Sequence, residues 1–222
     1  MTRTTNARLA GFTFLFYIAI ALPSMVLLDR ATNVEGIAAK LARVAEHASD
    51  VRVAVVLSMV SCFAALVLAV TLYAITRDED HDIAMVALTC RVAEGVSGVT
   101  FIVATLGLLW LATAGSNAPD AAAAQALGAF LLKVQGWNQT ISATFFAVGS
   151  TLFAWLLLRG RMIPAALAWL GVVASILLVV ALPLQLGGVL PAAIAQLMYL
   201  PMLAFEVPAG FWLLIKGAPL RH

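Results

Sequence analysis

Charged residues are scarce in this sequence, and their scarcity excludes most classes of soluble protein. Asp, Glu, Lys and Arg make up 11% of the 222 residues, whereas 63% are hydrophobic. Soluble domains carry about 25% charged residues, so this chain has too few to cover a water-exposed surface. The net charge of +2 is small and the basic residues are scattered, which argues against nucleic acid as a partner. The composition therefore predicts an integral membrane protein whose main partner is the lipid bilayer.

Residues that commonly carry catalysis or hold cofactors are also few. The three histidines are His47, His81 and His222, which fall in predicted loops or at the end of the sequence. This placement argues against a haem held by two histidines, and there is no HExxH zinc motif, GxSxG elbow or phosphate-binding glycine loop. Residues 78–82 could bind a divalent cation, although a solvated loop that caps the next helix is the simpler interpretation. We expect no cofactor, no metal and no catalytic residues.

Long apolar runs dominate the sequence. A transmembrane helix needs about twenty apolar residues, and six segments qualify: 9–28, 51–76, 83–113, 134–158, 163–182 and 190–215. The first run follows two arginines as a signal peptide would, but it is longer than a signal core and lacks a small-residue cleavage site. We therefore expect it to be a retained span. The prediction is an all-α fold, a polytopic transmembrane bundle of six helices that forms one domain over residues 1–222.

The one sizeable connection, residues 29–50, predicts a short amphipathic helix between the first and second spans. Thr32 and Glu35 have the spacing of a capping box, and apolar residues then recur at helical intervals as far as residue 48. Such a helix lies on the membrane or caps the bundle, although an ordinary connecting helix is the simpler alternative. A second helix start at 117–120 leads into the fourth span, with a bend expected near Gly136.

The distribution of basic residues predicts the orientation. With the N-terminus inside, seven basic residues fall on the cytoplasmic side and five on the outer side. The cytoplasmic ones are Arg3, Arg8, Arg77, Arg159, Arg161, Lys216 and Arg221. The short loops decide the orientation, because residues 159–161 include two arginines and residues 183–188 include none. We expect both termini in the cytoplasm and the amphipathic helix on the extracytoplasmic side.

Three charged residues fall inside apolar runs, where a charge is costly. If the third span starts inside near Asp82, Arg91 lies about 13 Å deep and Glu94 about 18 Å deep, and Glu206 in the returning sixth span lies about 15 Å deep. These depths are similar within a hydrocarbon core about 30 Å thick. An unpaired arginine at a helix centre costs about 2.5–3.5 kcal/mol on insertion scales. We expect Arg91 to pair with Glu94, with Glu206 or with both.

One arginine and two carboxylates leave a formal charge of −1 in this predicted cluster. Either one acid holds a proton because burial disfavours its charged form, or water or a bound cation reaches the site. A structural salt bridge, a ligand or ion site, and proton translocation are all compatible with the pattern. The salt bridge is the simplest of the three interpretations.

Five further residues are candidates for supporting the cluster. They are Tyr199, Gly98, Gly210, Pro201 and Pro208. By helical periodicity the tyrosine and the glycines share faces with the buried charges, and small residues there let helix backbones approach closely. The two prolines bracket Glu206, and each frees a backbone carbonyl four residues earlier. Broken helices of this kind recur at transporter substrate sites, but they also occur as plain kinks.

Several sequence landmarks occur in an order that resembles a known family. They are ARLAG (residues 7–11), RVAE (91–94), RGRMIP (159–164), LG (170–171), Glu206 near Pro201, and WLLIKG (212–217). Together they resemble the bacterial polytopic membrane proteins grouped as domain of unknown function 4386. The resemblance implies a bacterial inner-membrane protein and brings no activity with it. It also implies that Arg91, Glu94 and Glu206 belong to a shared pattern.

Two functions follow as expectations. The favoured one is a non-enzymatic membrane protein that binds a lipid or a small hydrophobic ligand, or that serves a structural role. The alternative is a small proton-coupled secondary transporter that uses the buried carboxylates of the third and sixth spans, Glu94 or Glu206. An intramembrane enzyme comes third, because it needs a second reactive group beside those carboxylates.

Overall fold

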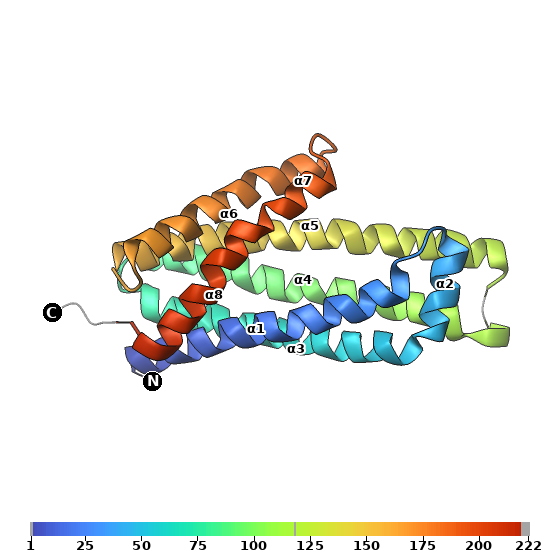
Figure 1. Cartoon of the computed structure of the whole chain (residues 1–222), viewed down its shortest axis with the longest axis horizontal. Helices are drawn as coiled ribbons and strands as arrows, with labels where there is room; N and C mark the ends of the chain where they lie inside the picture. Colours follow the sequence, from blue (N-terminus) through green and yellow to red (C-terminus); the bar gives the residue numbers. More distant parts are fainter. Residues whose placement is uncertain (1, 118, 219–222) are drawn as a thin grey trace. The chain divides into compact units, whose positions relative to one another are not determined.

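The structure, a computed structural model, describes residues 2–117 and 119–218, and within these ranges every regular element is a helix. The helices are α1 (Arg3–Thr32), α2 (Ile37–Glu46), α3 (Ala48–Thr76), α4 (His81–Thr113), the short η1 (Gly115–Asn117), α5 (Ala121–Arg159), α6 (Ala165–Leu186), α7 (Ala192–Leu197) and α8 (Tyr199–Lys216). Six segments are long and apolar enough to cross a membrane, with α7 and α8 together forming the sixth (Figure 1). The predicted all-α architecture with six spans is confirmed. Arg221, which counted toward the predicted orientation, and His222 lie outside the described residues.

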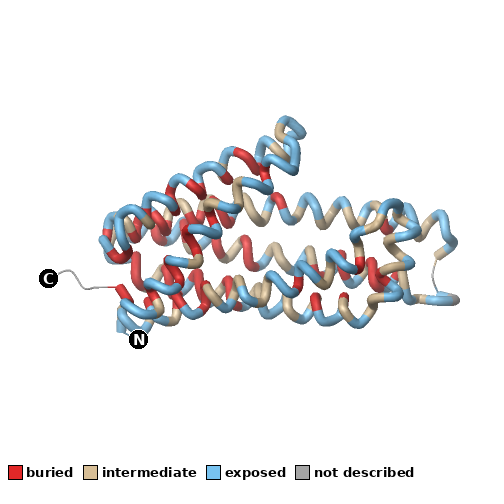
Figure 2. The backbone as a smooth tube through the Cα atoms, in the orientation of Figure 1, coloured by how far each residue is buried: buried red, intermediate tan, exposed pale blue. Residues whose placement is uncertain are grey.

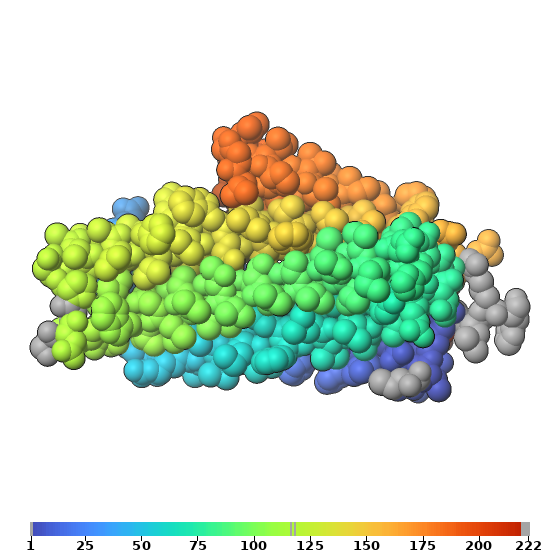
Figure 3. All heavy atoms as spheres, turned by 180° about the vertical axis from the view of Figure 1, so that it is seen from behind, coloured from blue at the N-terminus to red at the C-terminus, as the bar shows by residue number. Residues whose placement is uncertain are grey.

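Apolar side chains remain exposed along every candidate span. Between 22% and 44% of the residues in the most apolar stretch of each span are buried, so more than half of each stretch is half-buried or exposed. The tube coloured by burial shows exposed and buried residues following one another along the helices (Figure 2). The space-filling view shows atoms of α4 and α5 that no other helix covers (Figure 3). Apolar surface this extensive requires a bilayer rather than water. The chain is therefore a multi-pass membrane protein.

The chain divides into two compact units, each with a hydrophobic core of its own. Unit 1 comprises Met1–Tyr17, Phe63–Val96 and Thr140–His222, and unit 2 comprises Ile18–Cys62 and Ser97–Gln139. The larger core lies in unit 1 and includes side chains from α1, α3, α4, α5, α6 and α8. The smaller one, in unit 2, packs Ala31, Val44, Val51 and Leu109 together.

The predicted capping box at Thr32 is wrong. Thr32 is the last residue of α1, and its hydroxyl donates a hydrogen bond back to the Leu28 carbonyl at 2.8 Å. The helix α2 starts instead after Gly36, whose φ of 81° few other residues adopt readily. The end of α1 is satisfied from α2, because Lys40 donates to the Thr32 carbonyl at 2.6 Å. A basic side chain at a helix C-terminus thus replaces the expected hydroxyl at an N-terminus.

Aspartates begin the two longest helices. The Asp80 carboxylate accepts a hydrogen bond from the Ile83 amide at 3.2 Å, so the acidic loop does cap the helix that follows it. The Asp120 carboxylate accepts from the Ala123 amide at 2.8 Å. From there α5 continues without interruption for 39 residues, so the second helix start and the fourth span form a single helix.

A break divides the sixth span just before Pro201 and Glu206. The first part, α7, ends at Leu197, and α8 starts at Tyr199 after a turn at Met198. Pro201 therefore occupies the first turn of α8, where a missing amide leaves no hydrogen bond unmade. Within unit 1, α8 packs against α6, and α6 forms a hairpin with α7 and α8 (Figure 1).

Candidate functional site

Two of the predicted charges form a buried ion pair within unit 1. Arg91 and Glu94 lie one turn apart on α4, and the Arg91 Nη1 atom is 2.8 Å from the Glu94 Oε2 atom. Arg91 is 1% exposed and Glu94 is 7% exposed. At this burial both charges would be strongly destabilising alone, so each depends on the other.

The Arg91 side chain passes between its own helix and α5. The Phe146 ring centroid lies 4.7 Å from Arg91 Cζ, a cation–π contact. Gly149 provides the room, since a Cβ atom there would lie 2.8 Å from Arg91 Cγ. No oxygen among the described residues accepts a well-aligned hydrogen bond from the guanidinium nitrogens. Its charge is therefore balanced by the nearby Glu94 and the aromatic ring.

Glu94 connects three helices of unit 1. The Tyr17 side chain of α1 makes a hydrogen bond to its carboxylate, and the Ser142 hydroxyl of α5 donates to its backbone carbonyl at 3.2 Å. Tyr17 and Arg91 thus interact with the same carboxylate. Sequence periodicity did not identify Tyr17 and Ser142 as partners of Glu94, because it relates residues within one helix and does not align separate helices.

Glu206 lies in the same unit but forms no ion pair. It is 7% exposed on α8, and the preceding Phe205 packs its ring against Gly171 of α6. Among the residues that the structure describes, no basic nitrogen lies within 4.0 Å of its carboxylate. It does interact electrostatically with both Arg91 and Glu94. Of the two pairings expected for the arginine, the structure contains the one with Glu94.

Gly210 has the role expected of a small residue, and its partner is Gly11. A Cβ atom on Gly11 would lie 2.5 Å from the Gly210 carbonyl oxygen and would overlap the Leu214 backbone. The backbones of α1 and α8 therefore touch at these two glycines. This contact holds α8 against α1 one turn after Glu206.

The other supporting candidates are less closely connected to the charges. Gly98 belongs to unit 2, where a Cβ atom would lie 2.5 Å from Cys62 Sγ. Tyr199 is half-buried at the start of α8. Pro208 lies inside α8 and is exposed, so its ring faces away from the core.

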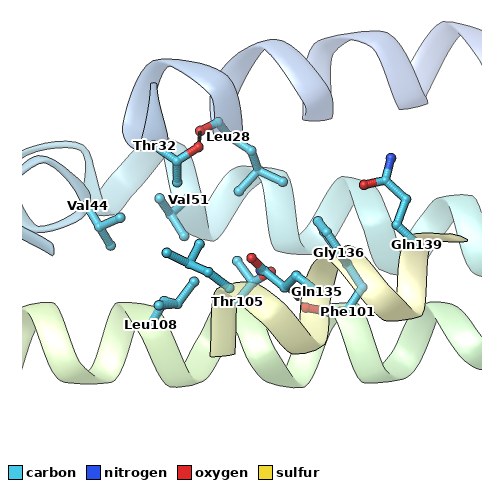
Figure 4. A pocket seen from close by; sticks show the side chains of 11 residues that line it. Leu28, Thr32, Val44, Val51, Phe101, Thr105, Leu108, Gln135, Gly136 and Gln139 are labelled. Carbon is cyan, nitrogen blue, oxygen red and sulfur yellow. Dashed lines mark hydrogen bonds between the residues drawn. The ribbon is translucent and has the colours of Figure 1, made fainter. Parts of the chain in front are cut away.

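Unit 2 contains a cavity of about 270 Å³ that sequence reasoning did not predict (Figure 4). Its lining is Leu28, Thr32, Val44, Val51, Phe101, Thr105, Leu108, Leu132, Gln135, Gly136 and Gln139. The Gln135 amide donates to the Thr105 hydroxyl at 2.7 Å. This bond joins α4 to α5, and the sequence pattern carries no signal for the hollow beside it.

Comparison with known proteins places the chain in a family. The model described as Domain of unknown function (DUF4386) matches residues 9–217, so the chain belongs to that family. The resemblance seen in the sequence landmarks is thereby confirmed. No curated protein and no solved structure matches the chain.

Proposed function

We propose that this member of the DUF4386 family is a non-enzymatic membrane protein that binds a lipid or a small hydrophobic ligand in the unit 2 cavity. The observation that carries the proposal is the cavity itself, about 270 Å³ in volume. An engineered cavity of about 150 Å³ already takes up benzene, and ordinary ligand pockets begin near 300 Å³. The charge cluster, by contrast, lies beside a cavity of only about 10 Å³, room for about one water molecule.

The lining of the cavity defines the class of ligand. Leu28, Val51 and Phe101 supply apolar walls, which favour an alkyl chain or an aromatic ring. Gln135 supplies a polar group, and its bond to Thr105 is the single hydrogen bond that its side chain makes within the described residues. Its amide oxygen is therefore available to a donor. A short acyl chain or ring with one hydroxyl, amine or protonated acid group fits both features, whereas a whole phospholipid is too large.

Gly136→Phe should abolish binding by filling the cavity. Gly136 lines the cavity, and a Cβ atom there meets nothing within 4 Å, so a side chain can enter without displacing the backbone. We expect a short fatty acid carrying a diazirine to cross-link to α4 and α5 residues around the cavity in the native protein. Gly136→Phe should reduce that labelling at least several-fold.

Ala126→Phe is the matched control, since it adds the same ring to an exposed position of α5 that does not line the cavity. Labelling should match that of the native protein. Equal labelling of the native protein and Gly136→Phe would contradict ligand binding at this cavity and would leave the structural role as the better proposal.

A second candidate function is proton-coupled transport, favoured by the buried, unpaired Glu206 on the broken sixth span. Transport needs water to reach that carboxylate from each side in turn. Single cysteines at Met202 and Ala209, in a background lacking Cys62 and Cys90, should then react with a membrane-impermeant thiol reagent added to either side. Protection of both positions from both sides would count against transport.

A further inference from the structure

We propose that Glu206 is a proton-binding site within the membrane, occupied at neutral pH, and that Arg91 and Glu94 remain ionised beside it. In this proposal, a proton bound to Glu206 neutralises the surplus negative charge of the cluster. It depends on neither function proposed above, because a resident proton is compatible with ligand binding, a structural role or transport.

The geometry first fixes which acid is paired. Arg91 is 2.8 Å from Glu94, and no basic group of the described chain lies within 4.0 Å of Glu206. The Arg91 charge attracts a negative charge on Glu206, whereas the Glu94 charge repels it. Because the ion pair is neutral as a whole, its two effects on Glu206 oppose each other.

Burial then makes the charged form of Glu206 costly. The residue is 7% exposed in the sixth candidate span. Transfer of an ion into such surroundings costs several kcal/mol even after relaxation. A buried acid without a compensating cation therefore takes up a proton and becomes neutral.

The neighbouring helices offer no other source of compensation. The helix α6 packs against α8, and its 22 residues include no ionisable side chain. The part of α5 in unit 1 has none before Arg159 at its end. From α1, Tyr17 is engaged with Glu94, Arg3 is paired with Glu79, and Arg8 is exposed at the start of the helix. On α8 itself, Lys216 is exposed in the last turn, ten residues after Glu206. Arg91 and Glu94 of α4 remain the two charged groups that act on Glu206.

A bound metal cation is a weaker alternative than a proton. Among residues 2–117 and 119–218, no group of three histidine, cysteine, aspartate or glutamate side chains could hold a metal ion. The second carboxylate near Glu206 belongs to Glu94, which is already engaged with Arg91. A single carboxylate is a poor site for a divalent ion, which prefers six or more oxygen ligands in the case of calcium.

Infrared spectroscopy of the native protein in lipid nanodiscs at pH 7 tests the proposal. A protonated carboxylic acid has a C=O stretching band that a carboxylate lacks. A glutamate side chain in water has a pKa of about 4.3 and is therefore ionised at pH 7. We expect the band in the native protein, a shift of the band when glutamate is labelled with carbon-13 at the carboxyl carbon, and loss of the band in Glu206→Gln.

Glu35→Gln is the matched control, because Glu35 is exposed and outside the spans, and it should retain the band. Absence of a labelled-glutamate band from the native protein at pH 7 would overturn the proposal without requiring any variant to fold. Persistence of the band in folded Glu206→Gln would overturn it as well, since the proton would then belong to another glutamate. Loss of the band in Glu206→Gln with retention in Glu35→Gln supports the assignment.

Discussion

Glu94→Gln should lower the free energy of unfolding by about 3–5 kcal/mol, the usual cost of removing one partner from a buried ion pair. The substitution leaves Arg91 buried at 1% exposure with no carboxylate within ion-pair distance. A guanidinium cannot lose its proton within a protein. The positive charge on Arg91 therefore persists in the substituted protein.

Arg91→Met should cost less, about 1–3 kcal/mol, although it breaks the same pair. Glu94 is left without its partner, but its carboxylate can take up a proton. The remaining cost is that of a neutral carboxylic acid with some of its hydrogen bonds unmade. Unfolding curves in mixed micelles with increasing denaturing detergent would measure both losses under identical conditions. A larger loss for Arg91→Met than for Glu94→Gln would contradict this asymmetry.

The double variant Arg91→Met with Glu94→Leu tests whether the charge balance of the pair or the other contacts of Arg91 stabilise unit 1. Apolar replacements of similar volume for both members of a buried pair are often neutral or stabilising. We expect the double variant to regain most of the stability lost in Glu94→Gln. Failure to regain it would mean that the contacts of Arg91 with Phe146 and Gly149, rather than its charge balance, stabilise unit 1.

The sequence predicted the elements of the fold well because a membrane-spanning helix needs about twenty mostly apolar residues in a row. Six apolar runs separated by polar loops identified six spans, and the observed ends of the second, third and fourth spans fall within a few residues of the prediction except where α5 extends back to Ala121. That extension is alanine-rich and lies beyond the predicted apolar run, and its start was predicted separately, as a helix that leads into the fourth span. Helix propensity, not hydrophobicity, continues the helix there.

The candidate site could be predicted only in part, because periodicity orders residues within a helix and not between helices. The spacing of Arg91 and Glu94 is local, and their pairing follows from one turn of α4. Whether Glu206 joins them depends on how α8 packs against its neighbours, which no local pattern encodes. The hollow in unit 2 depends likewise on the absence of side-chain volume at Gly136 and on the bulk of residues from five helices.

Gly11→Ala should destabilise unit 1 by about 3 kcal/mol, at the upper end of the range for overpacking. The new methyl group would lie 2.5 Å from the Gly210 carbonyl oxygen and would overlap the Leu214 backbone, and neither backbone atom can rotate away. The two helices must separate instead. Unfolding in mixed micelles would measure the loss.

Two other glycines provide graded controls for Gly11→Ala. A methyl group on Gly210 meets side-chain atoms of Phe14 and Leu15 at 3.1–3.2 Å, which can shift by a few tenths of an ångström, so Gly210→Ala should cost less. Gly136→Ala meets nothing within 4 Å and should add about 0.5–1 kcal/mol through its higher helix propensity. A loss for Gly136→Ala as large as that for Gly11→Ala would show that backbone contact is not the cause. Because Gly11→Ala pushes apart α1 and the helix that carries Glu206, it should also alter the infrared band of that acid.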